Sequence, residues 1–319
     1  MGNMKRAGLV FACVLIAVVF AAVAGARIDQ GKPLSGSVTA DGSSTVGPYT
    51  TAAAEGFGKR NPKARVTVGV SGTGGGFERF CRNETDLSNA SRPMKDSEAV
   101  KCRDAGVKWL AFTVANDGLS VVVNRSNTWA NCLTVAELKK IWEPGSKIEN
   151  WSQVRDGFPN VSLKLFGAGT DSGTFDYFTE AINGKARASR SDYLATEDDN
   201  VVVTGVQGER GALGYFGFSY YEENKDKLKV LAVDSGKGGG CVTPSIATVQ
   251  ANKYKPLSRP LFIYAKRDSF KRPVVAGFFG YLFNNEKAIA KQAGFIALTD
   301  RQLKKARYQY RVALKANSK

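Results

Sequence analysis

The chain has 319 residues, 43% hydrophobic and 23% charged, a balance typical of a globular protein long enough to bury two separate cores. It contains no histidine, which excludes hydrolases of the Ser-His-Asp and Cys-His types and an ordinary zinc site. The formal net charge is +16, but the basic residues are spread along the chain without a zinc finger or an aromatic-rich basic stripe, so we interpret them as a solvated surface and expect no nucleic-acid partner.

The amino end of the chain, residues 1–26, is typical of a secretory signal peptide. Lys5 and Arg6 precede an apolar run over residues 7–26, and the end of that run is rich in alanine. Cleavage after Ala24 or Ala26 would release an exported, periplasmic protein. The alternative is an uncleaved membrane anchor, because the run approaches the length that spans a bilayer.

From residue 34 onward, strand-like and helix-like segments alternate. Apolar or β-branched runs predict strands at residues 38–40, 66–70, 109–114, 119–123, 161–166, 230–233 and 261–265. Helices are predicted at residues 50–59, 77–82, 134–142, 175–182, 274–283 and 288–293. The third helix opens with a capping box, Thr134 and Glu137, and Asn116, Asp117 and Gly118 form a turn signal. The alternation predicts an α/β fold with parallel sheets, in which ligands bind at the carboxyl ends of strands.

Four cysteines follow the signal segment: Cys81, Cys102, Cys132 and Cys241. An even number in an exported chain indicates two disulfides, for which three pairings exist. Cys81 and Cys102 are close in sequence, so we favour a bond between them, which leaves Cys132 for Cys241. The alternative is a set of buried free thiols. No Cys-x-x-Cys spacing occurs, so redox catalysis has no support.

One short pattern, hydroxyl and glycine residues ahead of a helix-compatible segment, occurs at residues 41–46, 71–76 and 170–174. A helix N-terminus offers free backbone N–H groups and partial positive charge, and hydroxyls add further donors. Glycine lets the backbone approach a ligand closely. Together, such loops predict a site for a small, multiply charged oxyanion. Each loop alone also fits a plain turn or, for Asp171 and Ser172, a helix cap.

These loops can meet at one ion only if two lobes of the chain face each other. The turn signal at residues 116–118 gives one crossing between lobes, and the segment at 241–245 gives the return. We therefore expect a first lobe made of residues 34–116 and 245–319, and a second lobe made of residues 117–244.

At these loops the chain resembles the periplasmic phosphate-binding proteins that serve ABC-type phosphate importers. The resemblance runs from about residue 38 to about residue 303 and depends on the order of motifs at residues 42–45, 71–76, 89–93, 171–174 and 211–215. It implies an α/β, two-lobed, type II periplasmic-binding-protein fold that closes on inorganic phosphate in the cleft between its lobes. It also implies a monomer without cofactor, metal or catalysis, which delivers phosphate to an inner-membrane ABC permease.

Carried over position by position, the resemblance implies a phosphate site shared by both lobes. The first two loops supply hydroxyl and backbone donors, the Ser-Arg-Pro motif supplies a guanidinium, and the third loop closes over the ion. The implied residues are Ser44, Thr45, Ser71, Thr73, Arg92, Asp171, Ser172, Gly173 and Thr174.

The chain departs from one branch of this family, which has an arginine just before the third loop and an aspartate in the region of the second motif. Ala168 aligns with that arginine and Arg92 with that aspartate, as in the branch that carries the Ser-Arg-Pro phrase. A hydrogen-bond acceptor is needed to prefer protonated phosphate over sulfate. Asp171 is the leading candidate for that acceptor, followed by Asp41 and Asp117.

Two other functions remain as alternatives. A phosphatase or phosphoryl-transfer enzyme could use the same oxyanion loops, but such chemistry usually needs a metal, a base or a general acid. The absence of histidine and of a convincing carboxylate cluster counts against it. A basic protein that binds nucleic acid or another anionic surface would instead show strong, salt-sensitive DNA binding.

Overall fold

The structure is a computed structural model that describes residues 33–317. The signal peptide expected over residues 1–26 lies outside this range. Within residues 33–317, no helix combines the length and the apolar character that crossing a membrane requires.

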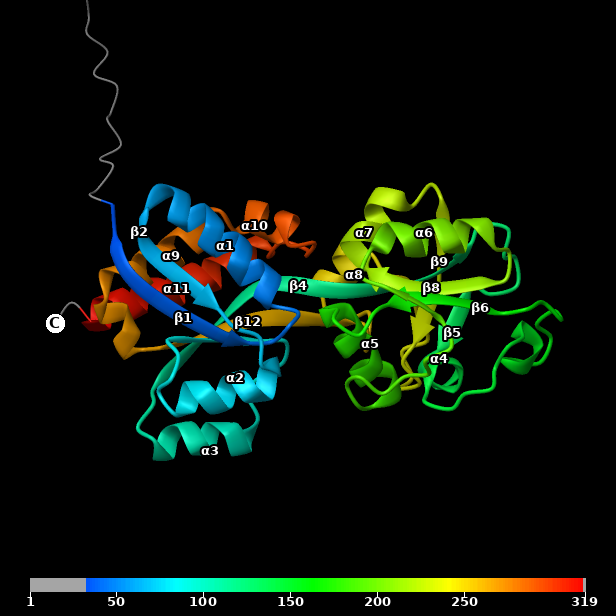
Figure 1. Ribbon diagram of the computed structural model, residues 1–319, viewed down its shortest axis with the longest axis horizontal. Coiled ribbons are helices and arrows are strands. Elements are labelled where there is room, and N and C mark those ends of the chain that lie inside the picture. Colours follow the sequence, from blue (N-terminus) through cyan, green and yellow to red (C-terminus); the bar gives the residue numbers. More distant parts are fainter. Residues whose placement is uncertain (1–32, 318–319) are drawn as a thin grey trace, which may run out of the picture. The chain divides into compact units, whose positions relative to one another are not determined.

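The first part of a mixed sheet is built from segments near both ends of the described chain (Figure 1). Its strands, in spatial order, are β2 (Lys63–Val68), β1 (Ser35–Gly42), β3 (Leu87–Ala90), β12 (Ser258–Lys266) and β4 (Trp109–Asn124). β1 pairs in parallel with β2 and β3, whereas β12 runs antiparallel to β3 and β4.

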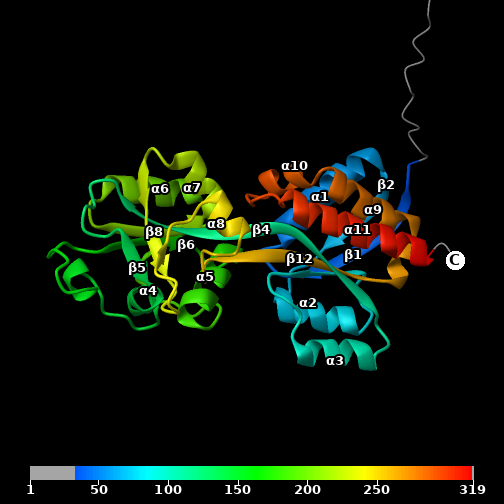
Figure 2. The same ribbon diagram turned by 180° about the vertical axis from the view of Figure 1, so that it is seen from behind.

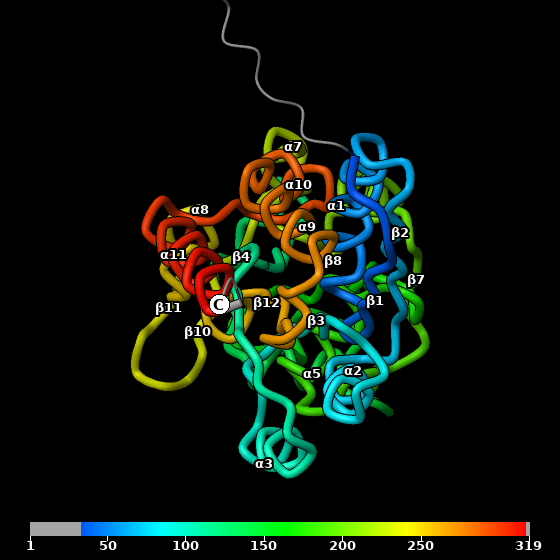
Figure 3. Tube along the Cα trace, turned by 90° about the vertical axis from the view of Figure 1, so that its left-hand side faces the viewer, coloured from blue at the N-terminus to red at the C-terminus, as the bar shows by residue number. Residues whose placement is uncertain are grey.

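Helices cover both faces of this part of the sheet, as the end-on view in Figure 3 shows. One face carries α1 (Gly47–Arg60), α9 (Pro273–Asn284), α10 (Glu286–Gln292), α11 (Asp300–Asn317) and the 3-10 turn η2 (Asp268–Lys271). The other face carries α2 (Gly72–Cys81) and α3 (Asp96–Asp104). We call this part of the molecule the first lobe.

The second lobe forms around the continuation of β4, and Figure 2 shows β4 and β12 running between the two sets of helices. β4 pairs antiparallel with β8 (Ala212–Gly217) and β9 (Leu228–Val230), and β6 (Lys164–Ala168) pairs in parallel with β8 and β7 (Leu194–Thr196). α4 (Val135–Trp142) and α5 (Gly173–Asn183) pack on one face, and α6 (Asp199–Gly208) and α7 (Phe218–Asn224) on the other. The remaining elements are η1 (Trp151–Gln153), α8 (Ile246–Gln250) and a small sheet of β11 (Cys241–Val242), β10 (Ala232–Asp234) and β5 (Cys132–Thr134).

The long strands are buried on both faces, which explains their nearly continuous apolar sequence. Successive side chains of a strand point to opposite faces. On β12, Ile263 packs with the core beneath α1 and α9, whereas Tyr264 packs with the cluster beneath α2. On β4, Val121 and Val122 likewise enter different clusters. Each lobe therefore has apolar packing on both sides of the shared sheet.

The predicted turn at residues 116–118 is wrong, because β4 passes through these residues without a break. The polar side chains that suggested a turn are buried and paired: Asn116 donates to the carbonyl of Ala297 at 3.1 Å, and Asp117 pairs with Arg259 at 3.2 Å. Gly118 is needed for packing, since a Cβ there would lie 2.8 Å from Val249. Long-range partners thus override a local turn signal.

The expectation of parallel sheets is only partly correct, because β4 and β12 pair antiparallel with their neighbours. The strand predicted at residues 230–233 is divided at Leu231 into β9 and β10, which belong to different sheets. The helix predicted at residues 134–142 is confirmed together with its capping box, in which Glu137 N donates to Thr134 Oγ1 at 3.1 Å.

Both favoured disulfides are confirmed. Cys81 on α2 is bonded to Cys102 on α3, with a sequence separation of 21. Cys132 on β5 is bonded to Cys241 on β11, with a sequence separation of 109, so it closes almost the whole second lobe. A disulfide restricts the unfolded chain more strongly when it closes a longer loop.

Replacing Cys132 and Cys241 together with serine should therefore destabilise the protein more than replacing Cys81 and Cys102. In the loop-entropy model the expected losses of unfolding free energy are about 5 and about 3 kcal/mol, respectively. Urea unfolding of both double variants, under conditions that keep the remaining disulfide oxidised, measures the difference. Equal losses would show that strain or residual structure, rather than loop length, decides the contribution.

Candidate functional site

The first hydroxyl-glycine loop lies where β1 ends beside β3. The backbone N–H of Ser43 donates to the carbonyl of Asn89 at 2.9 Å, which holds the loop against β3. Gly42 has a φ of 137°, and a Cβ there would lie 2.2 Å from the same carbonyl oxygen, so glycine is required. The loop then leads directly into α1, which starts at Gly47.

This loop contacts the start of α5, which belongs to the second lobe. Thr45 Oγ1 donates to the carbonyl of Gly173 at 3.2 Å, and Ser44 Oγ donates to Asp176 Oδ2 at 3.0 Å. A Cβ on Gly173 would lie 2.8 Å from the backbone N and Cα of Thr45. The first and third predicted loops, far apart in sequence, therefore meet backbone to backbone.

A cavity of about 740 Å³ opens at this contact. Its lining includes five of the residues expected from the sequence: Ser44, Thr45, Ser172, Gly173 and Thr174. Ser172 is the N-cap of α5, and its Oγ accepts from Thr174 N at 3.1 Å. A serine hydroxyl can accept and donate at once, so Ser172 keeps its own O–H for a ligand.

The other expected residues make different contacts. Ser71 Oγ donates to Asp41 Oδ1 at 2.6 Å, and Thr73 Oγ1 lies 3.0 Å from Ser91 Oγ. Asp171 is exposed, and its backbone N–H donates to Glu197 Oε1 at 3.2 Å. These three residues lie outside the lining of the 740 Å³ cavity, as far as residues 33–317 define it.

Arg92 borders a second cavity of about 400 Å³, together with Ser91. Its two Nη atoms donate to the two carboxylate oxygens of Glu98, each at 2.8 Å. The hydrogen bond to Glu98 raises the pKa of Arg92 and keeps the guanidinium charged. The structure thus separates Arg92 from the five residues around the larger cavity.

Sequence reasoning did not identify Arg259 on β12 as a site residue. Its Nη2 donates to Thr45 Oγ1 at 2.9 Å, and its Nε donates to Asp117 Oδ2 at 3.2 Å. The guanidinium carbon lies 3.3 Å from the centre of the Tyr177 ring. Burial raises the pKa of Asp117, and the charge of Arg259 opposes that rise. No local motif marks Arg259, because its position follows from the pairing of β12 with β4.

Acidic side chains and cysteines are not gathered into a metal site in the part of the chain that the structure describes. Among residues 33–317, no group of three or more His, Cys, Asp or Glu residues is arranged to hold a metal ion. The lining of the larger cavity combines hydroxyls with charged side chains, which are Asp117, Asp199, Glu222, Glu223, Lys287 and Lys291.

The fold and the cavity define a two-lobed α/β ligand-binding protein whose lobes meet at a hydroxyl-rich site. The model of the PBP superfamily domain matches residues 28–286. The chain is 46% identical over 302 residues to the protein SphX of Synechococcus elongatus, covering 94% of this chain and 89% of that protein. It is 40% identical over 279 residues to the phosphate-binding protein PstS of Staphylococcus saprophyticus, covering 86% of this chain and 84% of that protein.

Solved structures agree with these matches. The crystal structure of a possible phosphate binding protein from Planctomyces limnophilus is 47% identical, with a TM-score of 0.86, and covers 88% of this chain and 99% of that one. The fold also matches an ABC-type phosphate transport receptor from Vibrio cholerae, with a TM-score of 0.64 and 23% identity. This match covers 81% of this chain and 99% of that one. The chain belongs to the PBP superfamily and, within it, to the family of SphX and the phosphate-binding proteins named PstS.

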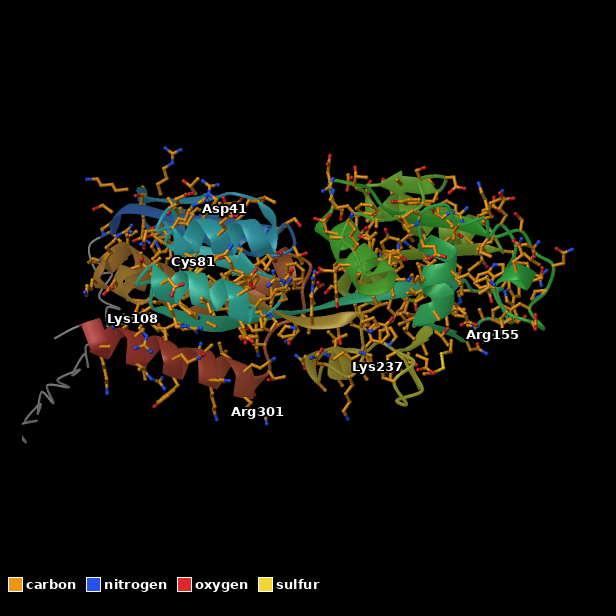
Figure 4. All side chains as sticks on the ribbon, turned by 90° about the horizontal axis from the view of Figure 1, so that it is seen from below. Asp41, Cys81, Lys108, Arg155, Lys237 and Arg301 are labelled. Carbon is orange, nitrogen blue, oxygen red and sulfur yellow. A yellow bond between two sulfur atoms is a disulfide. The ribbon has the colours of Figure 1, made fainter. Side chains whose placement is uncertain are left out.

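The contacts of Asp41 predict a structural role for this carboxylate, which Figure 4 labels on the first lobe. Its oxygens accept from Ser71 Oγ at 2.6 Å and from Arg79 Nη1 at 2.5 Å, and its side chain is 4% exposed. Asp41→Ala should lower the unfolding free energy by about 1–2 kcal/mol, because it removes the buried carboxylate to which Ser71 and the half-exposed Arg79 donate. Urea unfolding measures the loss, with the exposed Asp104→Ala as a control expected within about 0.5 kcal/mol of wild type. Unchanged stability of Asp41→Ala would contradict this role.

Proposed function

We propose that this protein binds inorganic phosphate outside the inner membrane and delivers it to an ABC-type phosphate permease. The observation that carries the proposal is the meeting of the Ser44–Thr45 loop with the Ser172–Thr174 turn around one cavity. The relatives support it, because PstS is named a phosphate-binding protein and the matched Vibrio cholerae structure is an ABC-type phosphate transport receptor.

The donors at this cavity suit a small dianion. Ser172 keeps its hydroxyl proton at the start of α5, where the helix N-terminus favours negative charge. Ser44 and Thr45 line the same cavity and donate to Asp176 and Gly173, so their hydroxyls would have to turn toward the ion. Hydrogen bonds to a charged group contribute about 1.5–3 kcal/mol each. Several of them support micromolar affinity, about −8 kcal/mol, after the cost of closing the lobes.

Ser71, Thr73, Arg92 and Asp171 belong to the same proposed site, at its edges. Thr73 contacts Ser91, which borders the smaller cavity together with Arg92. Both Nη atoms of Arg92 donate to Glu98, so Arg92 contributes positive charge at the edge of the site rather than a free fork.

We propose that the two lobes are hinged where β4 and β12 cross between them. Residues 34–116 and residues from about 258 onward belong to the first lobe, and residues 117 to about 257 belong to the second. Val249, Tyr254 and Leu257 pack in the second core, so we place the return crossing near Leu257 rather than at residues 244–245. A two-strand connection of this kind permits the hinge closure seen in binding proteins.

The family is one of binding proteins, and the comparisons give the phosphatase alternative no support. Its members named above are a phosphate-binding protein and a transport receptor, which hold a ligand rather than transform it. We further propose that the protein acts as a monomer without a nucleic-acid partner and that the mature chain is periplasmic.

Thermal-shift and calorimetric titrations test the proposed ligand. Phosphate should raise the melting temperature of the purified, phosphate-free protein, because a ligand that binds only the native state stabilises it. Sulfate at the same concentration should raise it much less. Equal stabilisation by both anions, or none by phosphate, would overturn the proposed function, and turnover of a phosphomonoester would favour the enzyme instead.

Ser172→Ala should weaken phosphate binding at least tenfold, because it removes the hydroxyl donor at the start of α5. Arg92→Ala should also weaken phosphate binding at least tenfold, because it removes a positive charge from the edge of the site and leaves Glu98 unpaired there. Thr134→Ala is the matched control, since it removes an equivalent N-cap on α4 outside the lining of both cavities. Calorimetry showing wild-type affinity in Ser172→Ala would contradict the site.

Gly173→Ala tests closure of the lobes without removing any polar group. Its new Cβ would lie 2.8 Å from the backbone of Thr45, so the two loops must separate. We expect phosphate affinity to fall at least tenfold while the fold is kept, as measured by calorimetry and circular dichroism. Gly208→Ala, where a Cβ meets nothing within 4 Å, should bind as wild type. Tight binding by Gly173→Ala would show that ligand capture does not require this contact.

A further inference from the structure

Arg259 lies at the junction of the two lobes. In the antiparallel pairing of β12 with β4, Arg259 is the direct partner of Asp117. From Leu119 onward, β4 pairs instead with β8 of the second lobe. Arg259 and Asp117 therefore lie on β12 and β4, the two strands that connect the lobes. Figure 2 shows these strands running from one lobe to the other.

The guanidinium of Arg259 contacts three separate elements. Nη2 reaches Thr45 in the loop before α1, Nε reaches Asp117 on β4, and the planar group lies over the ring of Tyr177 on α5. The side chain of Arg259 is only 12% exposed, and that of Asp117 is 7% exposed. A buried cation of this kind is stable because the carboxylate pairs with it and the aromatic face stacks on it.

Arg259 still has donors to offer. Guanidinium carries five N–H groups, and the hydrogen bonds to Thr45 and Asp117 use two of them. Within residues 33–317, its Nη1 has no hydrogen-bond partner. The residue borders the 400 Å³ cavity together with Ser91 and Arg92, while its partner Thr45 borders the 740 Å³ cavity. Its guanidinium therefore stands between the two cavities.

We propose that Arg259 is an anion-binding residue of this site, and that Asp117 positions it. This inference rests on the proposed function, since it assigns the cation that meets phosphate. The planar fork of a guanidinium matches two phosphate oxygens. Arg92 differs, because both of its Nη atoms are already bound to Glu98.

Asp117 and Tyr177 fix the direction of the fork. Asp117 accepts from Nε, Thr45 accepts from Nη2 and the ring of Tyr177 covers one face, so Nη1 and the second N–H of Nη2 are left for a ligand. Thr45 belongs to the first lobe and Tyr177 to the second, so Arg259 contacts both lobes in this structure.

Arg259→Lys is the primary test, because lysine keeps the charge but loses the fork. We expect phosphate affinity to fall at least tenfold in calorimetry. Arg155→Lys is the matched control: Arg155 also pairs with a carboxylate, Glu137 at 2.6 Å, and lies over an aromatic ring, Phe158 at 4.8 Å. Figure 4 labels Arg155 on the second lobe, away from Asp41. The control should bind within twofold of wild type.

A double-mutant cycle separates positioning by Asp117 from simple support of the fold. Asp117→Asn should weaken phosphate binding in the wild-type background and add little in the Arg259→Lys background, because both changes disturb one unit. Additive losses would show that Asp117 acts independently of Arg259 and would overturn the positioning role.

The outcomes distinguish this inference from the proposed function. A wild-type protein that does not bind phosphate refutes both. Wild-type affinity in folded Arg259→Lys refutes the inference and leaves the function intact. If the variants do not fold, a crystal structure of the wild-type protein with phosphate decides: a guanidinium nitrogen of Arg259 within about 3.2 Å of a phosphate oxygen supports the inference, and a phosphate out of its reach overturns it.

Discussion

The site depends on the backbone contact between Thr45 and Gly173. These residues are 128 positions apart, and they meet because β4 and β12 carry the chain from one lobe to the other and back. A side chain on Gly173 would not fit against Thr45, so the contact is available only to glycine. The hydroxyls of Ser44 and Ser172 come to one cavity as a consequence of this close approach.

Features determined by neighbouring residues could be predicted from the sequence. The capping box at Thr134 and the loop-to-helix transitions at Ser44 and Ser172 depend on contacts within a few positions, and the structure shows these helices where expected. The disulfides could also be predicted, because Cys81 and Cys102 are close in sequence, which leaves Cys132 for Cys241. The helix α11 was not predicted, although Leu303, Ala306 and Ala313 lie on its inner face at helical spacing among many charges.

Features that depend on distant partners could not be predicted. Asn116, Asp117 and Gly118 have the composition of a turn, yet each has a partner elsewhere in the chain that keeps it in β4. Arg259 has no motif at all, because its role follows from the strand register and from the placement of Thr45 and Tyr177. A buried charge at the junction of two lobes is visible only when the fold is known.

The charges at the site are balanced locally, even though the chain carries a net charge of +16. Arg259 pairs with Asp117, Arg92 with Glu98 and Arg79 with Asp41. Net positive charge attracts any anion from a distance, but it does not distinguish one anion from another. We therefore propose that anion selection depends on directed donors, namely hydroxyls and guanidinium groups held by carboxylates, and the overall composition carries little information about it.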